Sequence, residues 1–422
     1  MIDPKLIEGR AEVSVLKQNE GVVKMSMSAS TQEQAAKKIP WLELLALSMA
    51  GFICIMTETV PAGLLPQIGD GLHVSTAFAG QLVTLYALGS LAAAIPVTFA
   101  TQSWRRKPLL LFAIVLFFVF NSVTAFSSVY TVTLIARFFA GVGAGIVWSM
   151  LTGYARRMVS QELKGRATAI AMAGTPIALS LGVPIGTFLG GLMGWRAVFM
   201  IMSLLSLVLI IWIVLKVPDF SGNSKTLRVN VFNVLTIPGV RPILTVVILW
   251  MVSHNILYTY IAAFLTPAGL SSQTGTALLV FGVLSLIGIW VTGLFIDKRL
   301  RLLVLLSLLG FSITALLFQF SGYNSIVIFV GIALWGVTFG GAATLLQTAL
   351  AQAVGEANVD AAMSMNTTVW NMAIAGGGIF GGILLDHAGS QSFPMTMFLL
   401  ILAALIISFL NKKHAFPSSE TL

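Results

Sequence analysis

The sequence predicts an all-α integral membrane protein with twelve transmembrane helices, arranged as two similar sets of six. Of the 422 residues, 57% are hydrophobic and only 9% are charged, whereas soluble proteins carry about 25% charged residues. The apolar residues form repeated runs of about 20, the length at which a helix crosses a bilayer. Short polar connections, many of them basic, separate these runs. We therefore expect a multi-pass protein in contact with the lipid bilayer.

The connections divide the spans into two groups. Most are short, but 217–241 is longer and contains Pro, Gly, Ser and Asn, as a linker between two six-helix bundles does. We expect a first bundle over 41–216 and a second over 242–411, with tails at 1–40 and 412–422. The expected spans are 42–65, 77–100, 108–127, 131–153, 166–190, 196–216, 242–265, 274–296, 302–321, 325–349, 361–385 and 394–411.

Lys and Arg predict the orientation, because cytoplasmic loops carry an excess of these residues. One set of connections and both tails hold nearly all of them, whereas the other connections hold only Arg196. Both termini are therefore expected in the cytoplasm. The basic residues on the predicted cytoplasmic side include Lys37, Lys38, Arg105, Arg106, Lys107, Arg156, Arg157, Lys164, Arg166, Lys216, Lys225, Arg228, Arg241, Lys298, Arg299, Arg301, Lys412 and Lys413.

The N-terminal tail, 1–40, is polar and has no apolar periodicity, so it is expected to be disordered and not a signal peptide. Residues 7–10 match a protease-cleavage tag, and part of the tail need not be native.

Composition and motifs argue against several other classes. The one cysteine, Cys54, lies inside the first span, so no internal disulfide or thiolate metal site is expected. The net charge of +9 is spread over loops and indicates topology, not a nucleic-acid surface. No His-Glu-x-x-His, Gly-x-Ser-x-Gly or intramembrane Asp pair is present. We expect no enzyme, metal, cofactor or nucleic-acid partner.

An internal repeat supports the two bundles. A shift of 195 positions (377 minus 182) places Gly182 of span five on Gly377 of span eleven, and Arg106 on Arg301. Because each half has an even number of spans, the repeats are parallel. Transporters built this way place their binding site near the bilayer midplane, between the halves.

One carboxylate, Glu58, lies well inside the first span. A buried ionised carboxylate is costly unless it is paired or protonated. Proton carriers use this cost, because a buried carboxylate can take up and release a proton near neutral pH. The alternative is that Glu58 lies near the outer interface and is hydrated. Ionisable groups within spans are usually functional, so we expect a role in proton coupling.

Arg137 is a second charge within a span, the fourth. At 1.5 Å per residue, Glu58 lies about 24 Å from the cytoplasmic end of its span and Arg137 about 9 Å from the outer end of its own. Since the bilayer core is about 30 Å thick, the two charges are expected at a similar height, facing one cavity. The glycines that follow, at 141, 143 and 145, favour tight helix packing over a nucleotide-binding loop.

Span seven supplies a third candidate. Trp250, His254 and Tyr258 are spaced by four and therefore share one helix face. His254 lies about 18 Å into its span and is a candidate proton relay or substrate hydrogen-bond partner. The alternative is a core histidine with satisfied hydrogen bonds. Further candidates for the substrate cavity, for each of which packing is the simpler role, are Trp148, Trp335, Asn366 and Asn371.

The segment GLFIDKRLR, residues 293–301, resembles the loop motif of the major facilitator superfamily, Gly-x-x-x-Asp-basic-x-x-basic. In that family the acid and the arginine hold the inner ends of helices together, so the resemblance implies a conformational gate. In the first half Gln102 stands where Asp297 stands in the second, so the first-half acid is missing. The implied gate residues are Gly293, Asp297, Arg301 and Arg106.

Span five carries a second resemblance. Its Gly182-Val-Pro184-Ile-Gly186 resembles the Gly-Pro-x-x-Gly-Gly motif of the drug:proton antiporter branch. The valine after Gly182 makes it similar to bacterial sugar and nucleoside efflux permeases of that branch. Arg137 resembles an arginine that the family associates with proton transfer. Glycines four apart also form a groove for a neighbouring helix.

The resemblance covers residues 40–412 and implies the major facilitator fold. It implies alternating-access export of a small organic solute, such as a sugar, a nucleoside or base, or a drug-like molecule, in exchange for protons. The expected location is a bacterial inner membrane, and we expect a monomer. Uptake by proton symport or facilitated exchange is the alternative, because motif variants do not fix direction. A receptor without transport is less favoured, because no attached soluble domain is evident.

Overall fold

The computed structural model describes residues 39–94, 100–101, 103–160, 163–222, 234–355 and 358–416, and every regular element in these ranges is helical. The first half comprises α2 (Trp41–Thr59), η1 (Val60–Leu64), α3 (Leu65–Leu72), α4 (Thr76–Ala94), α6 (Arg106–Phe126), α7 (Tyr130–Arg157), α8 (Lys164–Met172), α9 (Gly174–Ile177), η3 (Ala178–Gly182), α10 (Val183–Met193) and α11 (Trp195–Lys216). The second half comprises α13 (Val240–Thr259), α14 (Ile261–Leu265), α15 (Thr274–Gln319), α16 (Ser325–Gly340), α17 (Ala342–Val354), α18 (Val359–Ala388) and α19 (Phe393–Leu410).

Within the described ranges, 11 helical segments are long and apolar enough to cross a membrane. One of them, α15, has 46 residues and a contour length of about 69 Å, more than twice the bilayer core of about 30 Å. Its backbone leaves the helical region at Arg299 (φ −138°, ψ 30°), where two helices meet. α15 therefore holds the predicted eighth and ninth spans, which accounts for all twelve crossings.

The turn expected between spans eight and nine agrees with the bend at Arg299, where the backbone leaves the helical region between two helices. The connection is short, because no Gly or Pro stands between 294 and 309 and Lys, Arg and Leu are strong helix formers. The tenth span is divided at Gly341 into α16 and α17.

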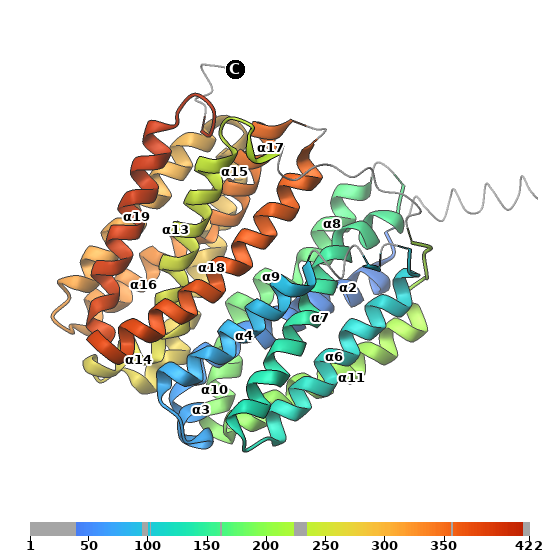
Figure 1. Ribbon diagram of the computed structural model, residues 1–422, viewed down its shortest axis with the longest axis horizontal. Helices are drawn as coiled ribbons and strands as arrows, with labels where there is room; N and C mark the ends of the chain where they lie inside the picture. Colours follow the sequence, from blue (N-terminus) through green and yellow to red (C-terminus); the bar gives the residue numbers. More distant parts are fainter. Residues whose placement is uncertain are drawn as a thin grey trace, which may run out of the picture.

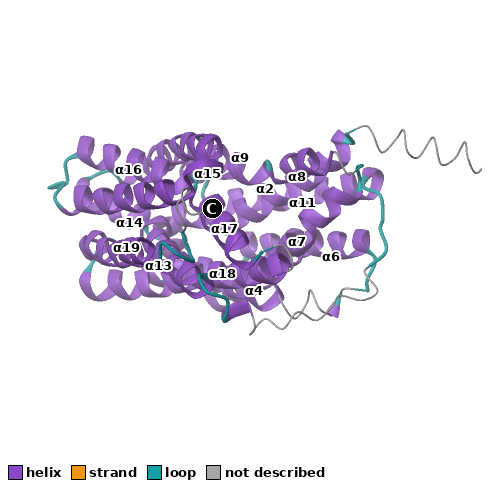
Figure 2. Cartoon of the chain, turned by 90° about the horizontal axis from the view of Figure 1, so that it is seen from above, coloured by secondary structure: helices purple, strands orange, loops and turns teal. Residues whose placement is uncertain are grey.

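The two halves lie side by side. Figure 1 shows the helices of the second half on the left and those of the first half on the right. Between them α4 packs along α18, as Figure 2 shows from above. On the other side α15 packs along η3 and α10. These two helix pairs form the seam between the halves.

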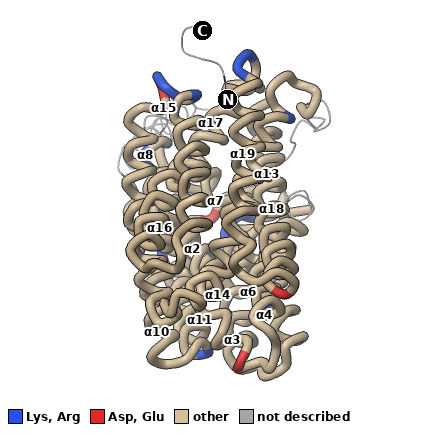
Figure 3. Tube along the Cα trace, turned by 90° about the vertical axis from the view of Figure 1, so that its left-hand side faces the viewer, with Lys and Arg blue, Asp and Glu red and all other residues tan. Residues whose placement is uncertain are grey.

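Charge distinguishes the two ends of the helix bundle. Figure 3 shows Lys and Arg concentrated where α15 bends, and few charges along the middle. We call this the basic end, made by 103–107, 156–160, 163–164, 216–222, 298–301 and 411–413. The opposite end is made by 73–75, 127–129, 194–196, 266–273, 320–324 and 389–392.

Close contacts between the halves gather toward the opposite end. The Tyr260 hydroxyl lies 3.3 Å from the carbonyl oxygen of Ala77 and 2.8 Å from that of Gly378. A Cβ added to Gly80 would overlap the Tyr260 ring, and one added to Gly282 would lie 2.5 Å from the Ser180 Cα. The missing side chains therefore let the halves meet closely at this end.

Span five packs its glycines against span one. A Cβ on Gly182 would lie 2.5 Å from the Met56 sulfur, and one on Gly190 would lie 2.5 Å from Leu64 Cδ2. A Cβ on Gly174 would overlap the backbone carbonyl of Ser48. Glycines at intervals of four create the groove that α2 and η1 occupy.

Between these glycines the helix widens into one π-helical turn, η3, where the Val183 amide donates to the Ala178 carbonyl. Pro184 follows directly, and a proline ring clashes with the carbonyl four residues earlier in a regular helix. The wider turn accommodates Pro184 without ending the span. Gly282 of the second half packs on the same turn, at Ser180.

Candidate functional site

Glu58 lies in the last turn of α2, before the chain narrows into η1, and it is half-buried. Within the described ranges the one ion pair within 4.0 Å joins Arg105 to Asp219, at 2.6 Å. Glu58 therefore has no described cation in direct contact.

Arg137 is fully buried. Its Nε donates to the Leu82 carbonyl at 3.2 Å, and its guanidinium lies 4.8 Å from the Tyr86 ring centroid. Its Nη1 and Nη2 have no hydrogen-bond partner among the described residues. The Tyr86 hydroxyl donates to the Cys54 carbonyl at 2.8 Å, one helical turn before Glu58. This charged cluster, Glu58, Arg137 and Tyr86, thus joins α2, α4 and α7.

Five rings form an aromatic cluster in the second half: His254, Tyr258, Phe281, Trp335 and Phe339. His254 stacks on Phe339 with centroids 3.6 Å apart and planes inclined by 1°. The centroids of Tyr258 and Trp335 each lie 5.2 Å from that of His254, and Phe281 lies 4.2 Å from Trp335. Trp335 Nε1 donates to His254 Nδ1 at 3.2 Å. The cluster joins α13, α15 and α16.

A contact across the seam connects the two clusters. Helix α13, which carries His254 and Tyr258, packs against η1, which directly follows Glu58 and Thr59. Thr59 in turn donates to the Ile55 carbonyl at 2.6 Å. The carboxylate of the first half and the aromatic cluster of the second therefore border the same region between the halves.

The structure brings together some of the predicted cavity residues and separates others. Trp250 approaches Phe339 edge-on at 6.4 Å, and its Nε1 is buried without a described partner. The remaining three make no described contact with the aromatic cluster. Trp148 lies instead near Gly51, Asn366 Oδ1 is buried without a described partner, and Asn371 donates to its own helix at Thr367.

Sequence reasoning missed Tyr86, Thr59, Phe281 and Phe339. Tyr86 could have been predicted, because a buried arginine needs a partner and the chain offers only 6 Tyr as candidates. Phe281 and Phe339 could not, being two among 27 Phe.

At the proposed gate, Arg301 binds carbonyl groups of its own half. Its guanidinium donates to Ser408 and Phe416 at 3.1 Å each and to Phe409 at 3.0 Å, near the end of α19. Asp297 is exposed and forms no ion pair with a described residue. The other residues of this prediction are Gly293, which has open space around it, Arg106, whose amide donates to Phe220, and Gln102, which lies outside the described residues.

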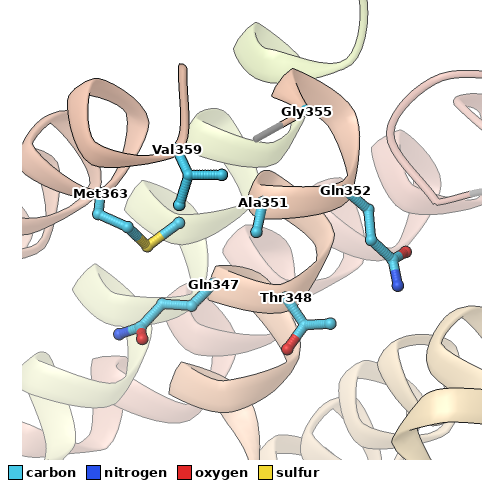
Figure 4. A pocket seen from close by; sticks show the side chains of 7 residues that line it. All are labelled: Gln347, Thr348, Ala351, Gln352, Gly355, Val359 and Met363. Carbon is cyan, nitrogen blue, oxygen red and sulfur yellow. The ribbon is translucent and has the colours of Figure 1, made fainter. Parts of the chain in front are cut away.

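A cavity of about 540 Å³ opens at the basic end of the second half. Figure 4 shows side chains of α17 and α18 along it. It lies far along the spans from the contacts that close the opposite end. Its lining residues are Gln347, Thr348, Ala351, Gln352, Gly355, Val359 and Met363.

The structure has the features of a membrane transporter. Two helical halves face each other, a carboxylate and an aromatic cluster lie at their seam, and the halves are in contact at one end. The chain belongs to the Major Facilitator Superfamily, whose family model matches residues 47–375 and 272–420. It is thus a transporter and not an enzyme.

Curated relatives carry a narrower description. The purine ribonucleoside efflux pump NepI of Shigella sonnei (strain Ss046) is 28% identical over 378 residues, covering 87% of this chain and 93% of that protein. NepI of Escherichia coli (strain K12) is 27% identical over 376 residues, with 87% and 93% covered. A crystal structure of a D-xylose-proton symporter shares the fold with a TM-score of 0.74 at 15% identity, covering 91% of this chain and all of that one.

Proposed function

We propose that this protein exports a purine ribonucleoside, or a closely related small solute, in exchange for protons. The observation that carries the proposal is Glu58, a half-buried carboxylate without a described ion-pair partner, in the helical turn before η1, which packs against the helix α13 of the aromatic cluster. A carboxylate in this position can alternate between protonated and ionised forms as its surroundings change. Rings that stack suit a planar base. The similarity to purine ribonucleoside efflux pumps supports that substrate class.

The proposed cycle is alternating access by a monomer. The bundles 41–216 and 242–411, joined by the linker 217–241, rock about the seam. Because Lys and Arg mark cytoplasmic loops, the basic end faces the cytoplasm of a bacterial inner membrane, with both termini inside. The contacts at Tyr260 then close the outer end. Glu58, Arg137 and His254 remain the candidates for proton coupling, and Asp297 and Arg301 those for the inner gate.

The test is transport of radiolabelled adenosine into proteoliposomes. With an acidic lumen and an alkaline bath, proton exit through an antiporter drives adenosine inward. A proton symporter takes adenosine up only under the reversed gradient, and a facilitated exchanger responds to neither. Either of the last two results would contradict export by antiport.

The role of Glu58 is tested in the same vesicles. We expect Glu58→Gln to abolish the response to the pH gradient while adenosine exchange without a gradient persists. Glu43→Gln, on the first turn of the same helix, is the matched control and keeps the response. Retained proton-driven flux in Glu58→Gln would remove this carboxylate from the coupling step.

A further inference from the structure

The hydrogen bond between Trp335 and His254 fixes the state of the imidazole. An indole nitrogen can only donate, so His254 Nδ1, 3.2 Å from Trp335 Nε1, must be the acceptor. A neutral imidazole that accepts at one nitrogen carries its hydrogen on the other. A protonated His254 would place two N–H donors against each other and lose this bond. The contact therefore selects a neutral His254 with its hydrogen on Nε2.

The surroundings of His254 agree with a neutral ring. Its ring neighbours are Phe339, Tyr258, Phe281 and Trp335. No described carboxylate pairs with His254. No ion pair between Glu58 and His254 is found among the described residues.

Nε2 remains available to a ligand. The buried side-chain polar atoms that lack a partner include Trp250 Nε1 but not His254 Nε2. Since Nε2 also has no described hydrogen bond, it keeps some access to solvent. Phe339, stacked on His254, is itself only half-buried. Part of the Phe339 ring is therefore exposed, and His254 Nε2 beside it carries an N–H without a described partner.

We propose that His254 determines substrate specificity as a neutral donor: its Nε2–H binds an acceptor nitrogen on the edge of a planar heteroaromatic ring. Trp335 is a positioning residue, which acts by fixing the tautomer. This inference rests on the proposed function and names the recognised group, a ring nitrogen of the purine base. It assigns His254 to substrate binding and leaves proton coupling to Glu58.

Binding of adenosine, 1-deazaadenosine, 3-deazaadenosine and 7-deazaadenosine to the purified protein tests this assignment by calorimetry. Each analogue replaces one ring nitrogen with C–H. We expect one of them to bind the wild type roughly tenfold more weakly than adenosine, because a donor is left unpaired. His254→Phe keeps an aromatic ring and removes the donor. It should bind adenosine and that analogue equally.

Two further variants separate specificity from structure. His254→Gln places an amide donor near the position of Nε2 and should restore part of the discrimination that His254→Phe loses. Trp335→Phe keeps a ring but frees the tautomer, and should reduce discrimination without loss of folding.

Three results would overturn the assignment. Equal affinity of the wild type for all four ligands would overturn it, as would an unchanged preference in His254→Phe. Loss of proton-driven transport in a folded His254→Gln that still binds adenosine would make His254 a proton carrier instead. If the wild type binds none of the four ligands, the proposed purine substrate falls as well, which distinguishes the two failures.

Discussion

The hydroxyl of Tyr260 lies 3.3 Å from the carbonyl oxygen of Ala77, and this contact ties the second half of the chain to the first. The ring behind it is fully buried and occupies space left by Gly80, Gly381 and Gly382. Tyr260 itself sits at the break between α13 and α14 (φ −108°, ψ 26°). A single hydroxyl at this break therefore helps to hold the opposite end closed.

Tyr260→Phe should increase the population that is open at this end. The ring still fills the space beside the three glycines, but a hydrogen bond with a net value of about 0.5–1.5 kcal/mol is lost. The equilibrium between the closed and open forms should therefore shift roughly two- to tenfold. Spin labels at Ser75 and Gln391, both exposed at the opposite end, report the distance in a Cys54→Ser background. Tyr323→Phe, at an exposed tyrosine of the same end, is the control. Identical distance distributions in all three proteins would contradict this role.

Gly174→Ala should destabilise the packing of span five on span one. The new Cβ would meet the Ser48 carbonyl and the Phe52 amide, which are backbone atoms and cannot rotate away. Overpacking of this kind costs about 1–3 kcal/mol. Thermal unfolding in detergent measures the loss. Gly191→Ala adds its methyl group where no atom lies within 4 Å and should leave stability unchanged; equal effects would refute the packing argument.

Arg137→Gln should move the pH optimum of transport upward, on the order of one pH unit. The arginine charge acts on Glu58, and a positive charge favours the ionised carboxylate. Without it the carboxylate keeps its proton to higher pH, so exchange of that proton requires more alkaline conditions. Arg137→Lys should shift the optimum less.

Transport between pH 5.5 and 8.5, normalised to folded protein, decides this point. The competing account is that Arg137 serves packing alone, through the Leu82 carbonyl and the Tyr86 ring. That account predicts reduced stability with no change in optimum, and an unshifted profile would support it.

Arg301→Ala should destabilise the end of α19. Three carbonyl groups lose a charged donor, and we expect a loss of about 1–3 kcal/mol. Arg301→Lys should recover part of it, because an ammonium reaches fewer of these acceptors at once. Thermal unfolding ranks the wild type and the two variants by stability. A stability of Arg301→Ala equal to that of the wild type would show that these hydrogen bonds do not stabilise the fold.

Asp297→Asn is expected to act differently, on the gate and not on folding. The exposed carboxylate has no described ion-pair partner in this structure, which is closed at the opposite end. If it pairs when the basic end closes, its loss should leave the basic end open more often. Labelling of Gln352→Cys, in the cavity of Figure 4, should then become faster. Unchanged labelling would exclude this gating role.

Sequence patterns were enough to find the helices, because each span is a run of apolar residues longer than a soluble helix requires. They also placed Trp250, His254 and Tyr258 on one face, since spacing by four has one geometric meaning in a helix. They could not join His254 to Trp335, because these residues are 81 positions apart and their meeting depends on how α13 and α16 pack. The connection between spans eight and nine was predicted from its charged residues, and the bend at Arg299 lies within it.

The carbonyl contacts of Arg301 have a counterpart that residue-by-residue alignment of the two halves does not show. Lys107 Nζ donates to the Val214 carbonyl at 2.9 Å, and Val214 corresponds to Phe409 (409 minus 195). In the first half the donor of this bond is the ammonium of Lys107, the neighbour of the position that corresponds to Arg301, and in the second half it is a guanidinium. What the two halves share is a hydrogen bond from a basic side chain of a loop to a carbonyl group in the last turn of a helix. The correspondence between the two repeats is then easier to follow in the hydrogen bonds that they form than in the residue types that they share.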